Sequence, residues 1–164
     1  MGFFKDLFFK SDDDMFGLEI NGLSKKIRKY KNTGDEVLLN SIVSAVPATL
    51  FTTYFKVSID APKTEVGTPV IIREGRKNYF PVFTRANRLM KWDPPKLENQ
   101  KYRIQNLYIS YLLDLMEDDE EYKDIAGIYI NPKSEDSSII ISRKTLFMTD
   151  EDDVETEKKE ASQE

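Results

Sequence analysis

The sequence predicts an α+β fold, built on a central, mostly antiparallel or mixed sheet of about five strands with flanking helices. The first observation is a hairpin pattern. Residues 68–73 and 79–84 alternate like strands, and residues 74–78 join them with Gly75 in the middle. The second is that apolar residues at helical spacing precede and follow this hairpin. With 164 residues, 40% hydrophobic and 32% charged, the chain has the composition of one soluble domain with short extensions.

Residues 1–31 are expected to form an amphipathic arm and a basic helix outside the main domain. Within residues 1–10, the side chains of Phe4, Leu7 and Phe8 share one face of a helix. This face predicts packing against the domain itself or against a partner. Peripheral membrane contact through residues 1–10 is the alternative.

The basic helix of this extension carries five positive charges between residues 24 and 31. Leu23, Ile27 and Tyr30 supply an apolar stripe at helical spacing beside these charges. We therefore interpret the charges as the solvated face of a packed helix. Contact with phosphate groups is the alternative interpretation.

Residues 32–149 are expected to form the α+β domain itself. Pro81 lacks a backbone donor and so predicts an edge strand or a bulge, and Gly127 predicts a close approach of another element to its backbone. The nearly continuous apolar run at 137–142 predicts a strand buried on both faces. We predict helices over 35–45, 85–92, 108–116 and 143–148, and strands over 49–57, 68–73, 79–84, 125–130 and 137–142, with a short strand near 102–104.

Residues 150–164 contain eight acidic residues and two lysines, and are expected to be a disordered acidic tail. The net charge of −5 therefore lies mostly in this tail, and the rest of the chain is close to neutral. A nucleic-acid-binding protein usually carries a basic excess over its folded body. The charge distribution thus favours other kinds of partner.

The chain contains neither Cys nor His. Their absence removes disulfides, thiolate metal sites, Cys nucleophiles and the commonest general base. No glycine-rich phosphate loop, serine-nucleophile elbow or dinucleotide-binding fingerprint is present in the sequence. We therefore predict that the protein is not an enzyme and has no catalytic residues, metal site or cofactor. A hydrolase using paired carboxylates is the remaining enzymatic alternative.

The sequence also bears on location. No apolar run approaches the roughly 20 residues that span a bilayer, and residues 1–10 lack the pattern of a secretory signal. These observations predict a cytoplasmic protein without a transmembrane segment.

Two segments carry a resemblance to a known family. The first is Phe80-Pro81-Val82-Phe83-Thr84, followed by a helix to Trp92, and the second contains Gly127, Asn131 and Pro132. On these segments the chain resembles the bacterial SseB-like N-terminal domain family over about residues 35–148. The resemblance implies a compact α+β domain without an established catalytic role, in which these motif residues are structural.

The function that we predict is that of a non-catalytic protein-interaction domain of the SseB-like type, which contacts another protein or a second copy of itself. Phe83, Trp92, Asp93 and Pro94 are the candidate partner-binding residues, because large aromatic side chains supply contact area at a low entropy cost. The alternative is single-stranded nucleic-acid binding, since residues 56–103 hold eleven basic and five acidic residues interleaved with aromatic rings.

Overall fold

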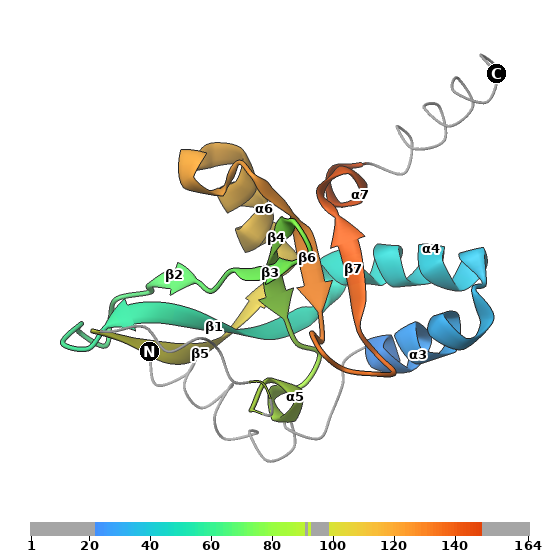
Figure 1. The fold of residues 1–164 in the computed structure, drawn as a ribbon, viewed down its shortest axis with the longest axis horizontal. Coiled ribbons are helices and arrows are strands. Elements are labelled where there is room, and N and C mark those ends of the chain that lie inside the picture. The colour runs from blue at the N-terminus through green and yellow to red at the C-terminus, as the bar shows by residue number, and fades with distance from the viewer. Residues whose placement is uncertain (1–21, 91, 93–98, 149–164) are drawn as a thin grey trace.

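The computed structural model describes residues 22–90, 92 and 99–148, and it confirms the α+β fold (Figure 1). The helices are α3 (Leu23–Thr33), α4 (Glu36–Ala45), α5 (Ala86–Met90), α6 (Ile109–Asp118) and α7 (Arg143–Phe147), with short 3-10 turns η2 (Val46–Ala48) and η3 (Glu120–Tyr122). The strands are β1 (Leu50–Ser58), β2 (Thr68–Pro69), β3 (Ile72–Glu74), β4 (Lys77–Val82), β5 (Gln100–Tyr108), β6 (Ile125–Ile130) and β7 (Ile139–Ser142). None of the described helices is long and apolar enough to cross a membrane.

The strands are divided between two sheets rather than gathered in one. The first sheet has the order β2-β1-β5 and is antiparallel throughout. The second has the order β3-β4-β6-β7 and is mixed, because β4 and β6 run parallel while the other pairs are antiparallel. A bridge between Thr52 and Phe83 links the two sheets, with N–H···O distances of 2.9 and 2.8 Å. The sheet predicted from the sequence is therefore present as two connected sheets.

The predicted central hairpin is present, and it spans both sheets. Its first strand is split, since β2 pairs with β1 whereas β3 pairs with β4. Glu74 and Lys77 pair across a two-residue turn that begins at Gly75, whose φ is 63°. Glycine is favoured there because L-residues with a side chain rarely adopt this conformation.

Pro81 lies in an interior strand, at a point where that strand has lost one neighbour. The pairing of β3 with β4 reaches only from Glu74 and Lys77 to Ile72 and Tyr79, so no residue of β3 pairs with Pro81. The pairing of β4 with β6 shifts register between Asn78 and Phe80, which places the predicted irregularity next to the proline. The Pro81 carbonyl accepts a hydrogen bond from Thr53 Oγ1 on β1. Pro81, which has no backbone N–H, thus lies where the hydrogen bonding between strands is already interrupted.

The interior consists of two clusters of buried apolar side chains. The larger contains Phe51, Phe80 and Ile128 from the two sheets, and Leu23 and Ile27 of α3 belong to it as well. The smaller contains Val70, Phe83, Leu89 and Trp92. Because Leu23 and Ile27 are fully buried, the basic helix packs on the same core as the sheets, with its apolar stripe inward as the sequence predicts.

The acidic end of α6 is held by an arginine from far along the chain. The helix ends at Asp118, two residues beyond the predicted end at Met116. Arg143 donates from Nη2 to the Met116 carbonyl at 2.8 Å and from Nη1 to the Lys123 carbonyl at 2.7 Å. A cation at a helix C-terminus satisfies open carbonyls and opposes the local negative charge. This contact explains why the helix tolerates its acidic last turn.

Candidate interaction surface

The motif residues of the sequence lie together at the carboxyl ends of β4 and β6. Phe80, Val82 and Phe83 are buried in the two core clusters. Gly127 lies in β6 directly against the backbone of β7, as predicted. Asn131 and Pro132 are buried at the start of the loop between β6 and β7, and Pro81 and Thr84 are buried as well.

Asn131 ties the end of β4 to the β6–β7 loop. Its backbone N–H donates to the Val82 carbonyl at 2.8 Å, and its φ is 49°. Its side-chain oxygen accepts from the Thr84 N–H at 2.9 Å, while Nδ2 donates to Thr84 Oγ1 at 3.0 Å and to the Ser137 carbonyl at 3.2 Å. Asn131, Thr84 and Ser137 are all buried, so this amide satisfies polar groups that water does not reach.

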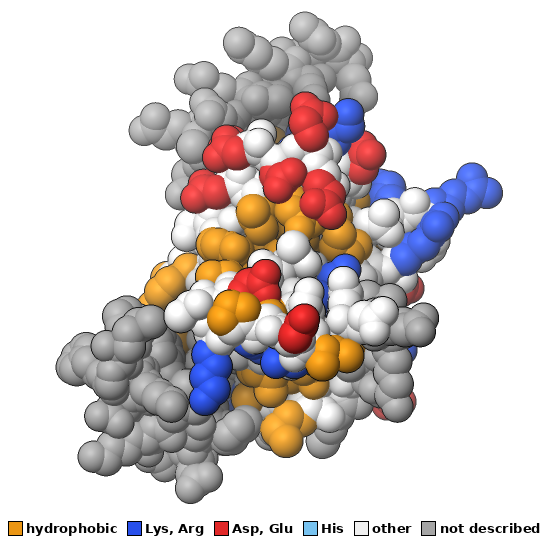
Figure 2. All heavy atoms as spheres, turned by 90° about the vertical axis from the view of Figure 1, so that its left-hand side faces the viewer, with side chains coloured by type: hydrophobic (Ala, Val, Ile, Leu, Met, Phe, Trp, Pro, Cys, Tyr) orange, Lys and Arg blue, Asp and Glu red, His pale blue; other side chains and the backbone are white. Residues whose placement is uncertain are grey.

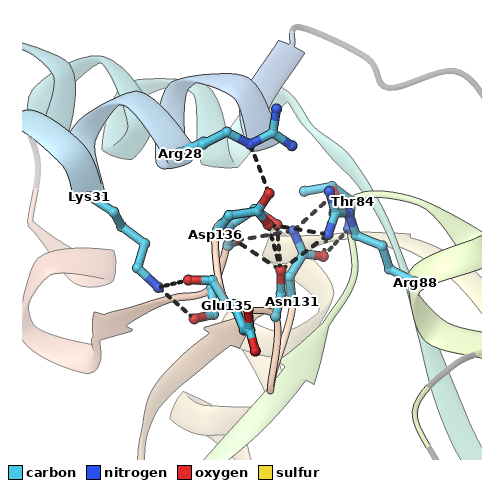
Figure 3. A network of polar contacts seen from close by, with 10 residues as sticks. Arg28, Lys31, Thr84, Arg88, Asn131, Glu135 and Asp136 are labelled. Atoms are coloured by element: carbon cyan, nitrogen blue, oxygen red, sulfur yellow. Dashed lines mark hydrogen bonds and ion pairs between the residues drawn. The ribbon is translucent and has the colours of Figure 1, made fainter.

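The same loop is fastened to α3 and α5, as Figure 3 shows. Asp136 pairs with Arg28 Nε of α3 at 3.0 Å and approaches Arg88 of α5 at 4.0 Å. Lys31 donates to the Glu135 carbonyl at 3.2 Å and to Ser138 Oγ at 3.1 Å. Two of the five cations of α3 are therefore engaged in holding the loop.

The Asp136 carboxylate gives the loop a pH dependence. A hydrogen bond from Ser134, and then the charges of Arg28 and Arg88, hold the pKa of Asp136 below its ordinary value of 3.8. A lowered folded-state pKa adds stability that is present above pH 3.8 and is lost as the pH falls through the folded value. We expect the wild-type protein to lose more stability between about pH 5 and pH 2 than Asp136→Asn, measured by urea unfolding at each pH. An identical loss in both proteins would contradict this assignment.

The described part of the predicted partner site lies in the interior. Phe83 is 1% exposed and Trp92 is 7% exposed, and their ring centroids are 5.6 Å apart. Trp92 also lies 5.9 Å from the ring of Tyr54. In this conformation the two rings stabilise the smaller core cluster. Asp93 and Pro94 lie outside the described residues, and so do residues 1–10 and the acidic tail.

One basic residue and two aromatic residues of the middle region are used within the fold. Arg103 donates to four carbonyls of the loop between β1 and β2, at 3.4, 2.9, 3.2 and 2.6 Å. Tyr79 and Phe80, two of the rings that single-stranded nucleic acid could stack on, are buried. Arg103 thus braces a loop, and these rings stabilise the core.

Exposed aromatic side chains gather instead where β5 runs into α6. Tyr108 is 51% exposed and Tyr111 is 40% exposed, and the Tyr111 ring lies 6.0 Å from that of buried Phe55. Tyr111, Asp114 and Asp118 follow one another at spacings of three and four, which places them on one side of α6. We call the exposed set Tyr108, Tyr111, Asp114, Glu117 and Asp118 the α6 surface.

Acidic residues continue from this surface around the end of the helix. Figure 2 shows acidic side chains gathered over α6 and η3, with hydrophobic side chains beside them. Burial, followed by the charges of Glu121 and Asp119, raises the pKa of Tyr122 to about 12. Residues 109–124 contain seven acidic residues and one lysine, and that lysine, Lys123, pairs with Glu120 at 3.1 Å. This end of the molecule is therefore strongly negative.

The sequence analysis predicted a helix over 108–116 and no site on it. The signal that could have found the α6 surface is the helical spacing of Tyr111 with Asp114 and Asp118. Among the described residues, no group of three or more Asp and Glu side chains is arranged to hold a metal ion. The surface therefore offers contact area and charge.

Comparisons with protein-family models, with curated protein sequences and with solved structures found no match for this chain.

Proposed function

We propose that the protein is a non-catalytic interaction domain that contacts a protein partner through the α6 surface. The observation that carries this proposal is the exposure of Tyr108 and Tyr111 beside three exposed carboxylates on a helix whose other side is buried in the core. Tyrosine supplies a large, stiff contact area, and hot-spot residues at protein interfaces are enriched in it. A rigid scaffold under such rings lowers the entropy cost of binding.

The position of the carboxylates supports contact in preference to chemistry. Asp114, Glu117 and Asp118 are exposed on the outer side of α6. A carboxylate that works as a general acid needs an environment that raises its pKa, usually by burial. A non-catalytic role is in keeping with the resemblance to the bacterial SseB-like family, and the expected setting of the protein is the cytoplasm.

A photo-crosslinking residue placed at position 111 tests the proposal. We expect full-length protein carrying benzoylphenylalanine in place of Tyr111 to form covalent adducts with protein on irradiation. The matched control carries the same residue in place of exposed Lys63, on the far loop between β1 and β2. Equal adduct formation at both positions, or none at position 111, would show that the α6 surface is not an interaction site.

A further inference from the structure

We infer that the α6 surface binds the lysine-bearing side of α3 on a second copy of the chain, with the two helices antiparallel. This inference rests on the proposed interaction function and names the partner. It follows from the charges of the two helices, from the spacing of those charges and from the positions of the helices in the fold.

The two helices carry opposite charges that are not used within the fold. In α3, Arg28 and Lys31 point toward the β6–β7 loop (Figure 3), whereas Lys25, Lys26 and Lys29 lie on a different side of the helix. Lys25 and Lys29 are exposed and Lys26 is half-buried. Within the described part of the chain, neither these lysines nor the three carboxylates of the α6 surface form an ion pair.

The spacing of the charges matches in one orientation only. Along α6 the carboxylates stand at Asp114, then three residues on at Glu117, then one further at Asp118. Read backwards along α3, the lysines stand at 29, then three residues on at 26, then one further at 25. Because both helices rise about 1.5 Å per residue, an antiparallel pair aligns all three opposite charges at once. Glu117 and Lys25 then lie on one side of the line of contact, and Asp118 and Lys26 lie on the other. The pairs are Lys29 with Asp114, Lys25 with Glu117 and Lys26 with Asp118, and the last two are offset by about 1.5 Å along the axis.

The same register gives the aromatic part of the surface a neighbour. Tyr111 lies one turn before Asp114, and Asn32 lies one turn after Lys29. In this register the Tyr111 ring is therefore at the level of exposed Asn32 along the helix axis. The contact thus contains three charge pairs and one aromatic ring. Parallel helices that set Lys25 against Asp114 would also bring Lys29 level with Asp118, but Lys26 would lie two residues, about 3 Å, from the level of Glu117.

One copy cannot make this contact with itself. In Figure 1, α6 lies at the upper left of the described fold and α3 at its lower right, beyond β7, so the charged sides of the two helices do not meet within one copy. Two copies can make it, since each offers a basic helix and an acidic one. The contact joins different surfaces of the two copies, so it is heterologous and can extend from copy to copy. Exposed ion pairs are individually weak and are screened by salt, so we expect association at high protein concentration and low ionic strength.

Sedimentation velocity of the full chain tests the inference. At about 20 mM salt, where the screening length exceeds 20 Å, we expect the weight-average mass of the wild-type protein to rise with concentration up to about 500 µM. At about 500 mM salt, where the screening length falls to a few ångströms, we expect the mass of a single chain. A single-chain mass under both conditions would overturn the inference.

Charge reversal identifies the surfaces. The triple variants Asp114→Lys/Glu117→Lys/Asp118→Lys and Lys25→Glu/Lys26→Glu/Lys29→Glu should each remain single chains at low salt. Mixed together they should associate, because the reversed α6 of one then matches the reversed α3 of the other. The single exchanges Glu117→Lys and Lys25→Glu form a milder complementary pair, should a triple variant lose its fold.

A matched control changes three cations elsewhere. Lys63→Glu/Arg76→Glu/Lys77→Glu has the same net charge as the α3 variant, and we expect it to associate like the wild-type protein. Association of either α-helix variant alone, or failure of the complementary mixture to associate, would overturn the inference. Adducts formed with other proteins from position 111, without any effect of charge reversal, would leave the proposed function standing and remove the second copy as its partner.

Discussion

We expect Gly127→Ala to destabilise the fold by about 3 kcal/mol or more, which is a large part of the stability of a domain of this size. Gly127 has a φ of 151°, which residues with a side chain rarely adopt. A Cβ at this position would collide with the Ile141 carbonyl oxygen and lie 3.0 Å from the Arg143 nitrogen. Both atoms belong to the backbone, so β7 would have to move away from β6. Urea unfolding followed by circular dichroism measures the loss.

Gly75→Ala is the matched control for this substitution. Gly75 also has a positive φ, 63°, but no atom lies within 4 Å of the position its Cβ would take. Only the backbone preference is then lost, at a cost of about 1 kcal/mol. If Gly127→Ala cost no more than Gly75→Ala, the close approach of β7 would not be what requires glycine in β6.

The parts of the fold that the sequence predicts are those set by local chemistry. The alternation on either side of Gly75 predicts the hairpin, and the stripe of Leu23 and Ile27 predicts which side of α3 is buried. Gly127 predicts a close backbone contact that the structure confirms. In each case the residue type limits the backbone conformation at its own position, or the spacing of apolar residues shows which side of the helix is buried. A short stretch of sequence is therefore enough to make the prediction.

The parts that the sequence does not predict depend on distant contacts. The division into two sheets follows from the split of residues 68–74, whose first part pairs with β1 and whose second part pairs with β4. The expectation that the last strand is buried on both faces was wrong. Ile140 of β7 is 39% exposed and Ser142, on the same face, is exposed as well, and β7 lies at the edge of its sheet. Arg103 and Arg143 satisfy main-chain carbonyls, and nothing in the sequence separates them from surface cations.

The aromatic residues show why the site was harder to predict than the fold. The same large rings stabilise cores and supply contact area at interfaces, so Trp92 and Tyr111 are alike as sequence signals. The structure buries Trp92 to 7% exposure and leaves Tyr111 at 40%. Trp92 follows α5 and packs in the smaller core cluster, whereas Tyr111 lies on the outer side of α6, and this difference is a property of the whole fold.

We expect Asn131→Ala to be the second strongly destabilising substitution, at about 4 kcal/mol. It removes the acceptor of the Thr84 N–H and the donors to Thr84 Oγ1 and to the Ser137 carbonyl. Each buried polar group left without a partner costs about 1–3 kcal/mol. Alanine at a φ of 49° adds roughly 1 kcal/mol of backbone strain, because asparagine tolerates this conformation better. Urea unfolding with circular dichroism detection measures the sum.

Asn131→Gly separates the two contributions. Glycine adopts the same backbone conformation without strain, so the difference between the alanine and glycine variants reports the backbone alone. The loss that remains in Asn131→Gly reports the hydrogen bonds of the amide. A loss below about 1 kcal/mol in the glycine variant would mean that water replaces the amide at Thr84 and Ser137. The loop would then be held mainly by the backbone hydrogen bond from residue 131 to the Val82 carbonyl and by the contacts of Asp136 with Arg28 and Arg88.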